Sequence, residues 1–542
     1  RSVGSKLLRN KAKELDFYYK TSSIPTAVST SLKSLTNNLD FKKKNNESKI
    51  TKTNLSEFNS TEQNSTTAAQ ESFNVKIDAE EIRPNLKSTA IPSSRIGRII
   101  SYGNIASSVG VGIFAEATKR IIGLSDKKGS TLMTESNVTR IVDGLTRMRG
   151  AALKLGQMLS IQDESILTPE LEAILLKVQN KANYMPDSQL EKVMRKELGE
   201  DWEEKHFSSF DRVPIAAASL GQVHIATTKA DNVKVAVKVQ YPGVASSIDS
   251  DLDNLRSLLV FSNLLPKGLY LDSTIKAARV ELSLECDYER ELKYMDKFHD
   301  LVKYNKNLNN FFYVPKTFKS ISTKRVLVSE FKKGISIGNI NLIKNLSQKD
   351  KNLIGDKFLK LSLSELFEFK LMQTDPNFSN FLFDGKLIYL IDFGATRNYS
   401  TKFILNYFRL LNFARKKDVD GCFNLSKELG FLTGFESEAM KNAHINSLIA
   451  LAEPFSSNHQ IFDFTHQDIT TKVKADIPLM LRERLSPPPV ESYSIHRKLS
   501  GLFLLCSKLG SQIECSRIFD EYFEKFEKLL EEQLLLEEKS II

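Results

Sequence analysis

The amino-acid sequence predicts an α+β fold with two lobes, and three observations lead to that prediction. Residues 233–239 alternate between valine or alanine and other side chains, as in a strand, with a lysine near the end. Residues 381–391 have the pattern of two short apolar strands around an Asp-Gly turn. From about residue 400 to residue 542 the spacing of apolar residues is helical. We therefore expect a first lobe built on a sheet and a second lobe that is mostly helical.

The segment around this turn carries side chains suited to phosphoryl transfer. A carboxylate at Asp375 would orient or deprotonate the acceptor, and oxygens of Asn380 and Asp392 would hold Mg²⁺ against the phosphates. Asp-x4-Asn followed by Asp-Phe-Gly is the spacing of a kinase catalytic core. Taken singly, the same residues would be turn residues beside Pro376 and the end of a strand.

Two upstream segments supply further parts of such a core. Lys238 ends a V-A-x-K pattern, in which the ammonium holds phosphates of ATP, although an edge-strand lysine pointing to water is the alternative. Glu330 ends an apolar strand that resembles a hinge, where backbone groups would meet adenine. The sequence thus predicts a bilobal protein-kinase-like fold with a helical N-terminal extension and a helical C-terminal region, with ATP and Mg²⁺ as cofactors.

Two features depart from an ordinary protein kinase. The phosphate-covering loop should be rich in glycine, but here it reads Ala216, Ala217, Ala218, Ser219. Alanines narrow the accessible backbone conformations, so we expect this loop to hold nucleotide differently. In addition, the chain runs from Gly394 into a new helical pattern at about residue 400, without a long activation segment. A groove for a peptide substrate is therefore not expected.

Two helical patterns carry further polar residues. Residues 137–159 have helical periodicity, and Lys154 and Gln157 are three apart, so they share one face. A solvated lysine beside a packed glutamine is the alternative interpretation. Residues 275–292 are also predicted to be helical, and this helix can carry the glutamate that pairs with Lys238.

These departures together resemble the UbiB family of atypical kinases, in particular its mitochondrial, ADCK-type members of coenzyme Q biosynthesis. The resemblance extends from about residue 91 to about residue 519. The residues that carry it are the K-x-G-Q of Lys154 and Gln157, the loop of Ala216 to Ser219, Lys238, the E-x-D of Glu285 and Asp287, and then Asp375, Asn380 and Asp392.

The resemblance implies a particular arrangement of the cleft. The helix with Lys154 and Gln157 would fold over it, facing Glu285 and Asp287, while Glu291 rather than Glu285 would pair with Lys238. Such a helix would obstruct a protein substrate. That favours ATP hydrolysis or a small lipid-like acceptor, with a true small-molecule or protein kinase, or a nucleotide- and lipid-binding scaffold, as alternatives.

The composition limits the compartment and the partners. The four cysteines form no CxxC pair, which fits a reduced compartment without a zinc site or disulfide framework. The net charge of +10 is concentrated towards the N-terminus, and no nucleic-acid-binding motif accompanies it, so no nucleic-acid partner is expected. Residues 1–90 have the low-complexity, basic composition of a disordered tail with the remnant of a mitochondrial targeting region.

Residues 99–115 are uncharged and apolar to small, between basic flanks, and are at the short end for a membrane span. Gly103 and Ser107 form a small-xxx-small pair that permits close helix association in lipid, and the resemblance suggests a homodimer through this helix. A buried or surface helix is the alternative.

The predicted organisation has five parts. They are a tail at 1–90, a membrane-associated or transmembrane helix at 91–122, the K-x-G-Q extension at 130–205, a kinase-like N-lobe with inserted helices at 206–334, and a kinase-like C-lobe at 335–542. The resemblance implies support of coenzyme Q synthesis at the matrix face of the mitochondrial inner membrane, with enzymes of that pathway and membrane lipids as partners.

Overall fold

A computed structural model describes most of the chain from residue 183 onwards and parts of the chain before it. The residues described are 73, 87–92, 97, 98, 100–105, 107, 108, 110, 111, 135–148, 183–262, 271–456 and 461–541. Two predicted site residues, Lys154 and Gln157, lie outside this set. The predicted tail lies almost wholly outside it too.

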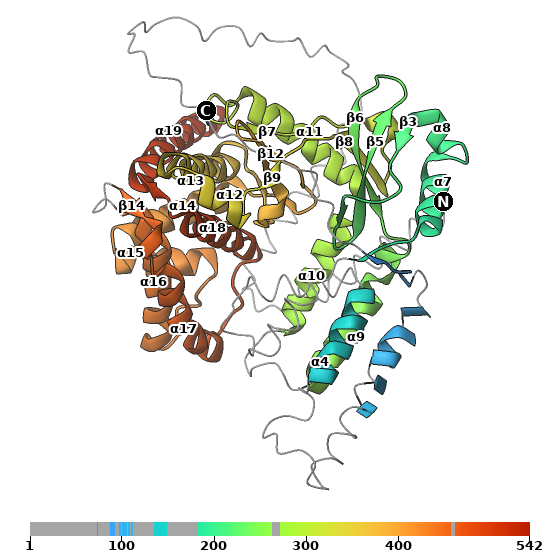
Figure 1. Ribbon diagram of the computed structural model, residues 1–542. Helices are drawn as coiled ribbons and strands as arrows, with labels where there is room; N and C mark the ends of the chain where they lie inside the picture. Colours follow the sequence, from blue (N-terminus) through green and yellow to red (C-terminus); the bar gives the residue numbers. More distant parts are fainter. Residues whose placement is uncertain are drawn as a thin grey trace, which may run out of the picture. The chain divides into compact units, whose positions relative to one another are not determined.

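The first lobe is built on an antiparallel sheet of five strands in the order β3-β5-β6-β8, with β4 paired to β5 (Figure 1). Their bounds are Phe207–Phe210, Ala216–Ala217, Gly221–Thr228, Lys234–Gln240 and Val326–Glu330 for β3, β4, β5, β6 and β8. Strand β6 is the strand predicted around Lys238. Its side chains alternate between the faces of the sheet, so Val235, Val237 and Val239 are buried while Lys238 points to the other face.

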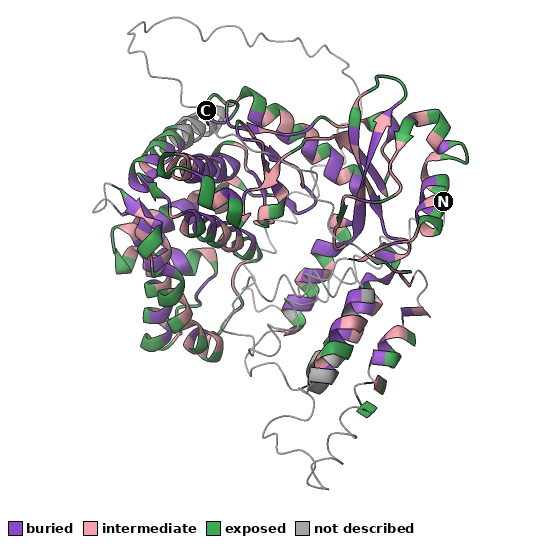
Figure 2. Ribbon diagram, in the orientation of Figure 1, coloured by how far each residue is buried: buried purple, intermediate pink, exposed green. Residues whose placement is uncertain are grey.

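Helices pack against this sheet and complete its core. Leu190 and Met194 of α7 and the indole of Trp202 in α8 are buried in one cluster with the valines of β6, and Figure 2 shows the strands as mostly buried. The helices of this part of the chain are α4 (Glu135–Met148), α7 (Asp187–Leu198), α8 (Trp202–His206), α9 (Val244–Ser262) and α10 (Leu271–Glu285). A short parallel pair, β1 (Lys87–Ser88) and β2 (Asn183–Tyr184), precedes α7.

The helix predicted over residues 275–292 is wrong in one respect, because the structure divides it. Helix α10 ends at Glu285, and α11 (Tyr288–Tyr304) begins after Asp287. The Asp287 side chain accepts a hydrogen bond from the backbone N–H of Arg290 at 3.1 Å and so caps α11. Aspartate competes for backbone donors in this way at helix starts, and the continuous apolar spacing hides the break. Glu285 and Glu291 therefore lie on different helices.

The second lobe contains the predicted hairpin. Strands β11 (Phe381–Phe383) and β12 (Ile388–Leu390) pair antiparallel, and Gly385 has φ +96° in the turn between them. This hairpin joins β9 (Ile335–Ser336) and β7 (Phe312–Tyr313) in one sheet. A separate pair, β10 (Leu371–Gln373) and β13 (Thr396–Asn398), flanks the segment that carries Asp375 and Asp392.

Helices form the remainder of this lobe, as predicted (Figure 1). Helix α14 begins directly after β13 and is capped by Ser400, so the connection is as short as the sequence indicates. The helices are α12 (Ile340–Asn345), α13 (Gln348–Leu363), α14 (Thr401–Arg415), α15 (Val419–Leu429), α16 (Glu438–Ala452), α17 (Ile469–Glu483), α18 (Val490–Leu509) and α19 (Cys515–Ile541). The short elements are η3 (Lys319–Ile321), η4 (Ser364–Glu368), η5 (Phe378–Asn380), η6 (Glu453–Phe455), β14 (Phe462–Asp463), η7 (Phe464–His466) and β15 (Gln512–Ile513).

The described residues between 97 and 111 are helical and lie against α4 and α9. Arg98 forms a 2.6 Å ion pair with Asp251 of α9, and both side chains are 1% exposed. Ile105 fits against Gly144 of α4, where a Cβ atom would come within 2.3 Å of the isoleucine side chain. Among the described residues, no helix combines the length and apolarity needed to cross a bilayer.

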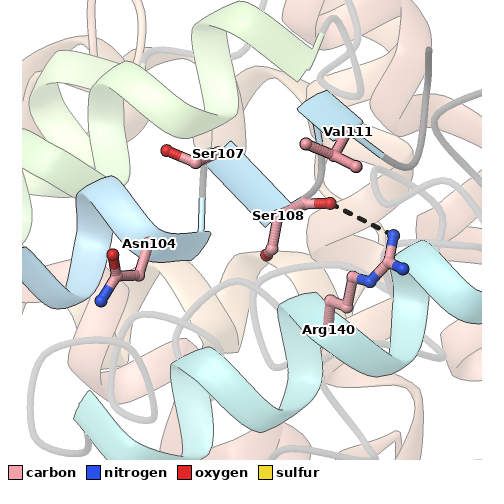
Figure 3. Close-up of a pocket in the computed structure, with 5 residues that line it drawn as sticks. All are labelled: Asn104, Ser107, Ser108, Val111 and Arg140. Carbon is pink, nitrogen blue, oxygen red and sulfur yellow. Dashed lines mark hydrogen bonds between the residues drawn. The ribbon is translucent and has the colours of Figure 1, made fainter. Parts of the chain in front are cut away.

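The other side of this helical stretch is open. A Cβ atom on Gly103 would meet nothing within 4 Å, and Ser107 is exposed. Figure 3 shows a pocket between these residues and α4, where Arg140 donates a hydrogen bond to the carbonyl oxygen of Ser108 at 3.2 Å.

Candidate active site

The site begins with Lys238, whose ammonium is held between two carboxylates. It donates to Glu291 at 2.8 and 3.0 Å and to Asp392 at 3.2 Å. The ring of Tyr288 lies on another side, with its centroid 5.1 Å from the ammonium nitrogen. Glu291 and Tyr288 are three residues apart on the first turn of α11, so that turn brings both side chains to the lysine.

Burial and charge act against each other in this cluster. Burial disfavours the charged form of Lys238, but the carboxylates of Asp392 and Glu291 outweigh it and hold the lysine pKa well above its usual value. Burial raises the pKa of Glu291 to about 7, against the pull of Lys238. The cluster therefore keeps a cation beside two carboxylates of unlike basicity.

The hairpin brings the two predicted metal ligands together. The backbone N–H of Ile391 donates to the carbonyl of Asn380 at 3.1 Å, so Asn380 lies opposite the residue before Asp392. The amide nitrogen of Asn380 is buried and has no hydrogen-bond partner among the described residues. Because an amide can be flipped about its last bond, its oxygen can occupy that same position.

An unsatisfied buried amide beside a carboxylate is what a Mg²⁺ site needs. Mg²⁺ is held by one or two protein oxygens together with substrate phosphates and water. Within the described ranges no group of three or more His, Cys, Asp or Glu residues could hold a metal, and Asn380 with Asp392 does not require one. The residues present thus fit a metal that arrives with a nucleotide.

Asp375 lies on the loop between β10 and η5. The preceding residue, Thr374, donates from its backbone and its hydroxyl to the carbonyl of Ala395, at 3.2 and 2.5 Å. These bonds hold the Asp375 loop against the segment after Asp392. The carboxylate of Asp375 itself caps the backbone of Asn377 at 3.3 Å, and the side chain is half-exposed.

The alanine loop forms a tight turn between β4 and β5. Ala216 is exposed, whereas Ala217, Ala218 and Ser219 are half-buried. The N–H of Ala218 donates to the carbonyl of Gly221 at 2.8 Å. At Gly221 a Cβ atom would lie 2.5 Å from the Val239 carbonyl oxygen and 2.7 Å from the Tyr288 hydroxyl, so only glycine fits there. The turn is thereby held against the strand of Lys238 and the first turn of α11.

The remaining predicted residues are placed as follows. A Cβ atom on Gly394 would lie 3.4 Å from Cγ of Glu285 and 3.5 Å from oxygens of both Asp392 and Glu291, so these three carboxylates converge. Asp287 has the capping role described above. Glu330 accepts from the Tyr313 hydroxyl at 2.6 Å and from the backbone of Lys316 at 3.1 Å, which leaves its carboxylate engaged within the protein.

Several residues of this neighbourhood were missed in the sequence. Arg290 of α11 donates to the carbonyls of Gly394, at 2.9 Å, and Thr396. Arg497 of α18 donates to the carbonyl of Thr374 at 3.0 Å and pairs with Glu281 of α10 at 3.1 Å. Neither arginine belongs to a local motif. Only the ExD helix break near Arg290 could have indicated one of them.

A two-lobed fold in which a strand lysine, a helix glutamate and a hairpin with Asn380 and Asp392 meet defines an atypical kinase, a phosphotransferase. Residues 177–426 match the ABC1 atypical kinase-like domain. The chain is 46% identical over 448 residues to the mitochondrial atypical kinase COQ8 of Saccharomyces cerevisiae, covering 82% of this chain and 88% of that protein. The chain belongs to this family, the COQ8 atypical kinases of the UbiB type.

Two further relatives extend the comparison. The mitochondrial atypical kinase COQ8 of Schizosaccharomyces pombe is 48% identical over 437 residues, covering 80% of this chain and 70% of that protein. The mitochondrial atypical kinase COQ8B of Danio rerio is 41% identical over 461 residues, covering 84% and 72%. The predicted family and fold class are thus confirmed, and so is the prediction of a phosphotransferase.

Proposed function

We propose that the protein binds Mg-ATP in the cleft around Lys238 and transfers or hydrolyses its terminal phosphoryl group in support of coenzyme Q biosynthesis. The observation that carries this proposal is the contact of Lys238 with both Glu291 and Asp392, beside the unsatisfied amide of Asn380. These are the positions that phosphoryl transfer needs for a phosphate-binding cation and for metal ligands.

Each residue has a role in this proposal. Lys238 binds phosphate oxygens, and Glu291 orients its ammonium. Asn380 and Asp392 would hold Mg²⁺, which when bound neutralises charge on the phosphates. Asp375 orients the acceptor, either water or a hydroxyl, and accepts its proton. The alanine loop covers the phosphates, while Glu285, Asp287, Lys154 and Gln157 shape the cleft on its acceptor side.

The cellular role is proposed from the relatives. Three similar proteins are named as mitochondrial, and their COQ8 names associate them with coenzyme Q. We place this chain at the matrix face of the mitochondrial inner membrane, with enzymes of the pathway and membrane lipids as partners, and with the helical residues near 99–115 as the membrane-associated part. A homodimer through that part belongs to the same proposal.

Phosphate release from the purified protein is the test. It should be measured with Mg-ATP alone, then with liposomes and with phenolic mimics of quinone precursors. Asp375→Asn should bind Mg-ATP normally and turn over about a hundredfold more slowly, because the acceptor loses its base. Asp392→Asn should lose turnover with an intact fold.

Asp231→Asn, at an exposed turn remote from the cluster, is the matched control and should behave as the wild type. If Asp392→Asn released phosphate at the wild-type rate, this assignment of the site would be wrong. Transfer to a mimic without net phosphate release would identify a small-molecule kinase.

A further inference from the structure

We propose that helix α18 positions the catalytic loop and that Lys498 is the residue through which it does so. The inference rests on the proposed function, in which Asp375 orients the acceptor. Helix α18 lies outside residues 177–426, the part of the chain that matches the kinase-like domain. It packs against α13 in the second lobe.

One face of α18 touches the loop and its flanking strands at four successive points. Ser494, Arg497, Lys498 and Gly501 are spaced by three, four and seven residues, so they share that face. They contact, in order, the Tyr399 hydroxyl at 2.7 Å, the Thr374 carbonyl at 3.0 Å, the Gln373 carbonyl at 2.9 Å, and Pro376. The contacts with residues 373, 374 and 376 surround Asp375 on both sides.

Lys498 is the most deeply buried cation of this face. Its ammonium donates to the carbonyl of Gln373 and forms a 2.8 Å ion pair with Glu365, and the two side chains are 5% and 1% exposed. Glu365 lies in η4, a π-helical turn at the end of α13. Such a turn inserts one residue into the helical repeat and is frequent at functional sites.

The two partners hold both backbone groups of one residue. Lys498 binds the carbonyl of Gln373, and a backbone hydrogen bond with Gln373 also lowers the pKa of Glu365, which burial raises overall. Gln373 is two residues before Asp375. The ion pair therefore fixes the strand end from which the catalytic carboxylate projects.

A buried ion pair is a poor way to gain stability, since an apolar pair of the same volume often serves as well or better. It is a good way to fix the direction of a carbonyl, because a cation attracts it over a short and well-defined distance. This difference separates a positioning role from a packing role.

Gly501 supports the same conclusion independently. A Cβ atom at this position would come within 2.1 Å of Cβ of Pro376. The helix therefore approaches the loop more closely than any side chain would permit, directly after Asp375.

The first test is the double variant Glu365→Gln/Lys498→Met. It keeps side-chain volume and the acceptor for the Gln373 N–H, leaves no unpaired buried charge, and removes only the cation on the Gln373 carbonyl. We expect a melting temperature close to that of the wild type and an unchanged Kd for Mg-ATP. We expect kcat to fall by about ten- to hundredfold, because small misplacements of a catalytic group have effects of that size. Ser500→Ala, on the exposed face of α18, is the matched control and should leave all three quantities unchanged.

The second test is Gly501→Ala, which displaces Pro376 without touching the ion pair. It should lower kcat without changing the Kd for Mg-ATP. In both variants the backbone amides of residues 373–375 should exchange with deuterium faster than in the wild type, and in Ser500→Ala they should not.

The outcomes are distinguishable from failure of the proposed function. A wild-type protein that releases no phosphate would refute the proposed function, while the exchange measurement would still decide the role of α18. Wild-type kcat and wild-type exchange in a folded double variant would overturn the inference. A fall in melting temperature and in Mg-ATP affinity together, without a separate effect on kcat, would show packing alone and would also overturn it.

Discussion

At the scale of single residues, the site depends on how charges share one buried cation. Lys238 contacts Glu291 and Asp392, and its ring neighbour Tyr288 prevents water from reaching one side. Glu291 is 1% exposed, so its only means of staying ionised at neutral pH is the lysine beside it. Asp392 is more exposed at 31% and is the carboxylate that can turn towards a metal.

Glu291→Gln should weaken nucleotide binding while leaving the fold intact. The amide keeps the volume but not the charge, so Lys238 turns towards Asp392, and both are then less available to phosphate and metal. Hydrogen bonds to charged groups contribute about 1.5–3 kcal/mol, so we expect the Kd for Mg-ATP to rise about ten- to hundredfold. Titration calorimetry measures this directly. Glu289→Gln, on the exposed side of the same turn, should bind as the wild type does, and equal Kd values for all three proteins would refute the role of Glu291.

At the scale of elements, a polar network joins the N-terminal extension to the sheet of the first lobe. Gln222 of β5 accepts from the backbone of Met185 at 2.8 Å and lies 2.9 Å from His224. The other ring nitrogen of His224 lies 2.8 Å from the carbonyl of Asp211 and so must donate to it. The neutral ring fits this arrangement, because a second N–H would face the amide group of Gln222.

This network predicts loss of stability in acid. Burial lowers the pKa of His224 from 6.5 to about 4. The unfolded chain then binds a proton that the folded chain does not, so the contribution is complete above pH 6.5 and is lost as the pH falls towards 4. The loss amounts to about 3 kcal/mol at pH 4.

Urea unfolding of the wild type and of His224→Gln between pH 4 and 7 measures it. The difference in unfolding free energy between the two should shrink or reverse at low pH, since other buried histidines such as His444 are common to both. A difference that does not change with pH would contradict the assignment.

The elements also show what the sequence could predict. The hairpin of β11 and β12 and the strand of Lys238 follow from local patterns, because a turn type and a two-residue alternation are set by neighbours in the chain. The break between α10 and α11 does not, because apolar spacing continues across it while Asp287 ends the helical hydrogen bonding. The contacts of α18 with residues 373, 374 and 376 could not be predicted at all. They join residues more than a hundred positions apart and depend on how helices pack, not on any motif.

At the scale of the whole molecule, the described residues near 97–111 are part of the folded first lobe. The Arg98–Asp251 pair joins residues 153 positions apart, and the Ser247 hydroxyl donates to the same carboxylate oxygen at 2.9 Å. Tyr102 and Ile105 are buried in the same cluster as the valines of β6. This helical stretch is therefore attached to the lobe that carries Lys238, whatever its exposed side contacts.

Arg98→Met should destabilise the protein more than any loss of surface charge would. Asp251 is 1% exposed, and burial already raises its pKa, while Arg98 lowers it. Without the arginine the carboxylate is a buried charge that has lost its counterion, and breaking such a pair costs about 3–5 kcal/mol. Arg98→Met/Asp251→Leu should recover most of that loss, because apolar side chains of similar size replace both charges. Arg140→Met, at an exposed arginine of α4, should change the free energy of unfolding by no more than about 0.5 kcal/mol. Urea unfolding of the four proteins decides the matter: if the double variant is as unstable as Arg98→Met, the two charges do not stabilise each other and the stretch is held by its apolar contacts alone.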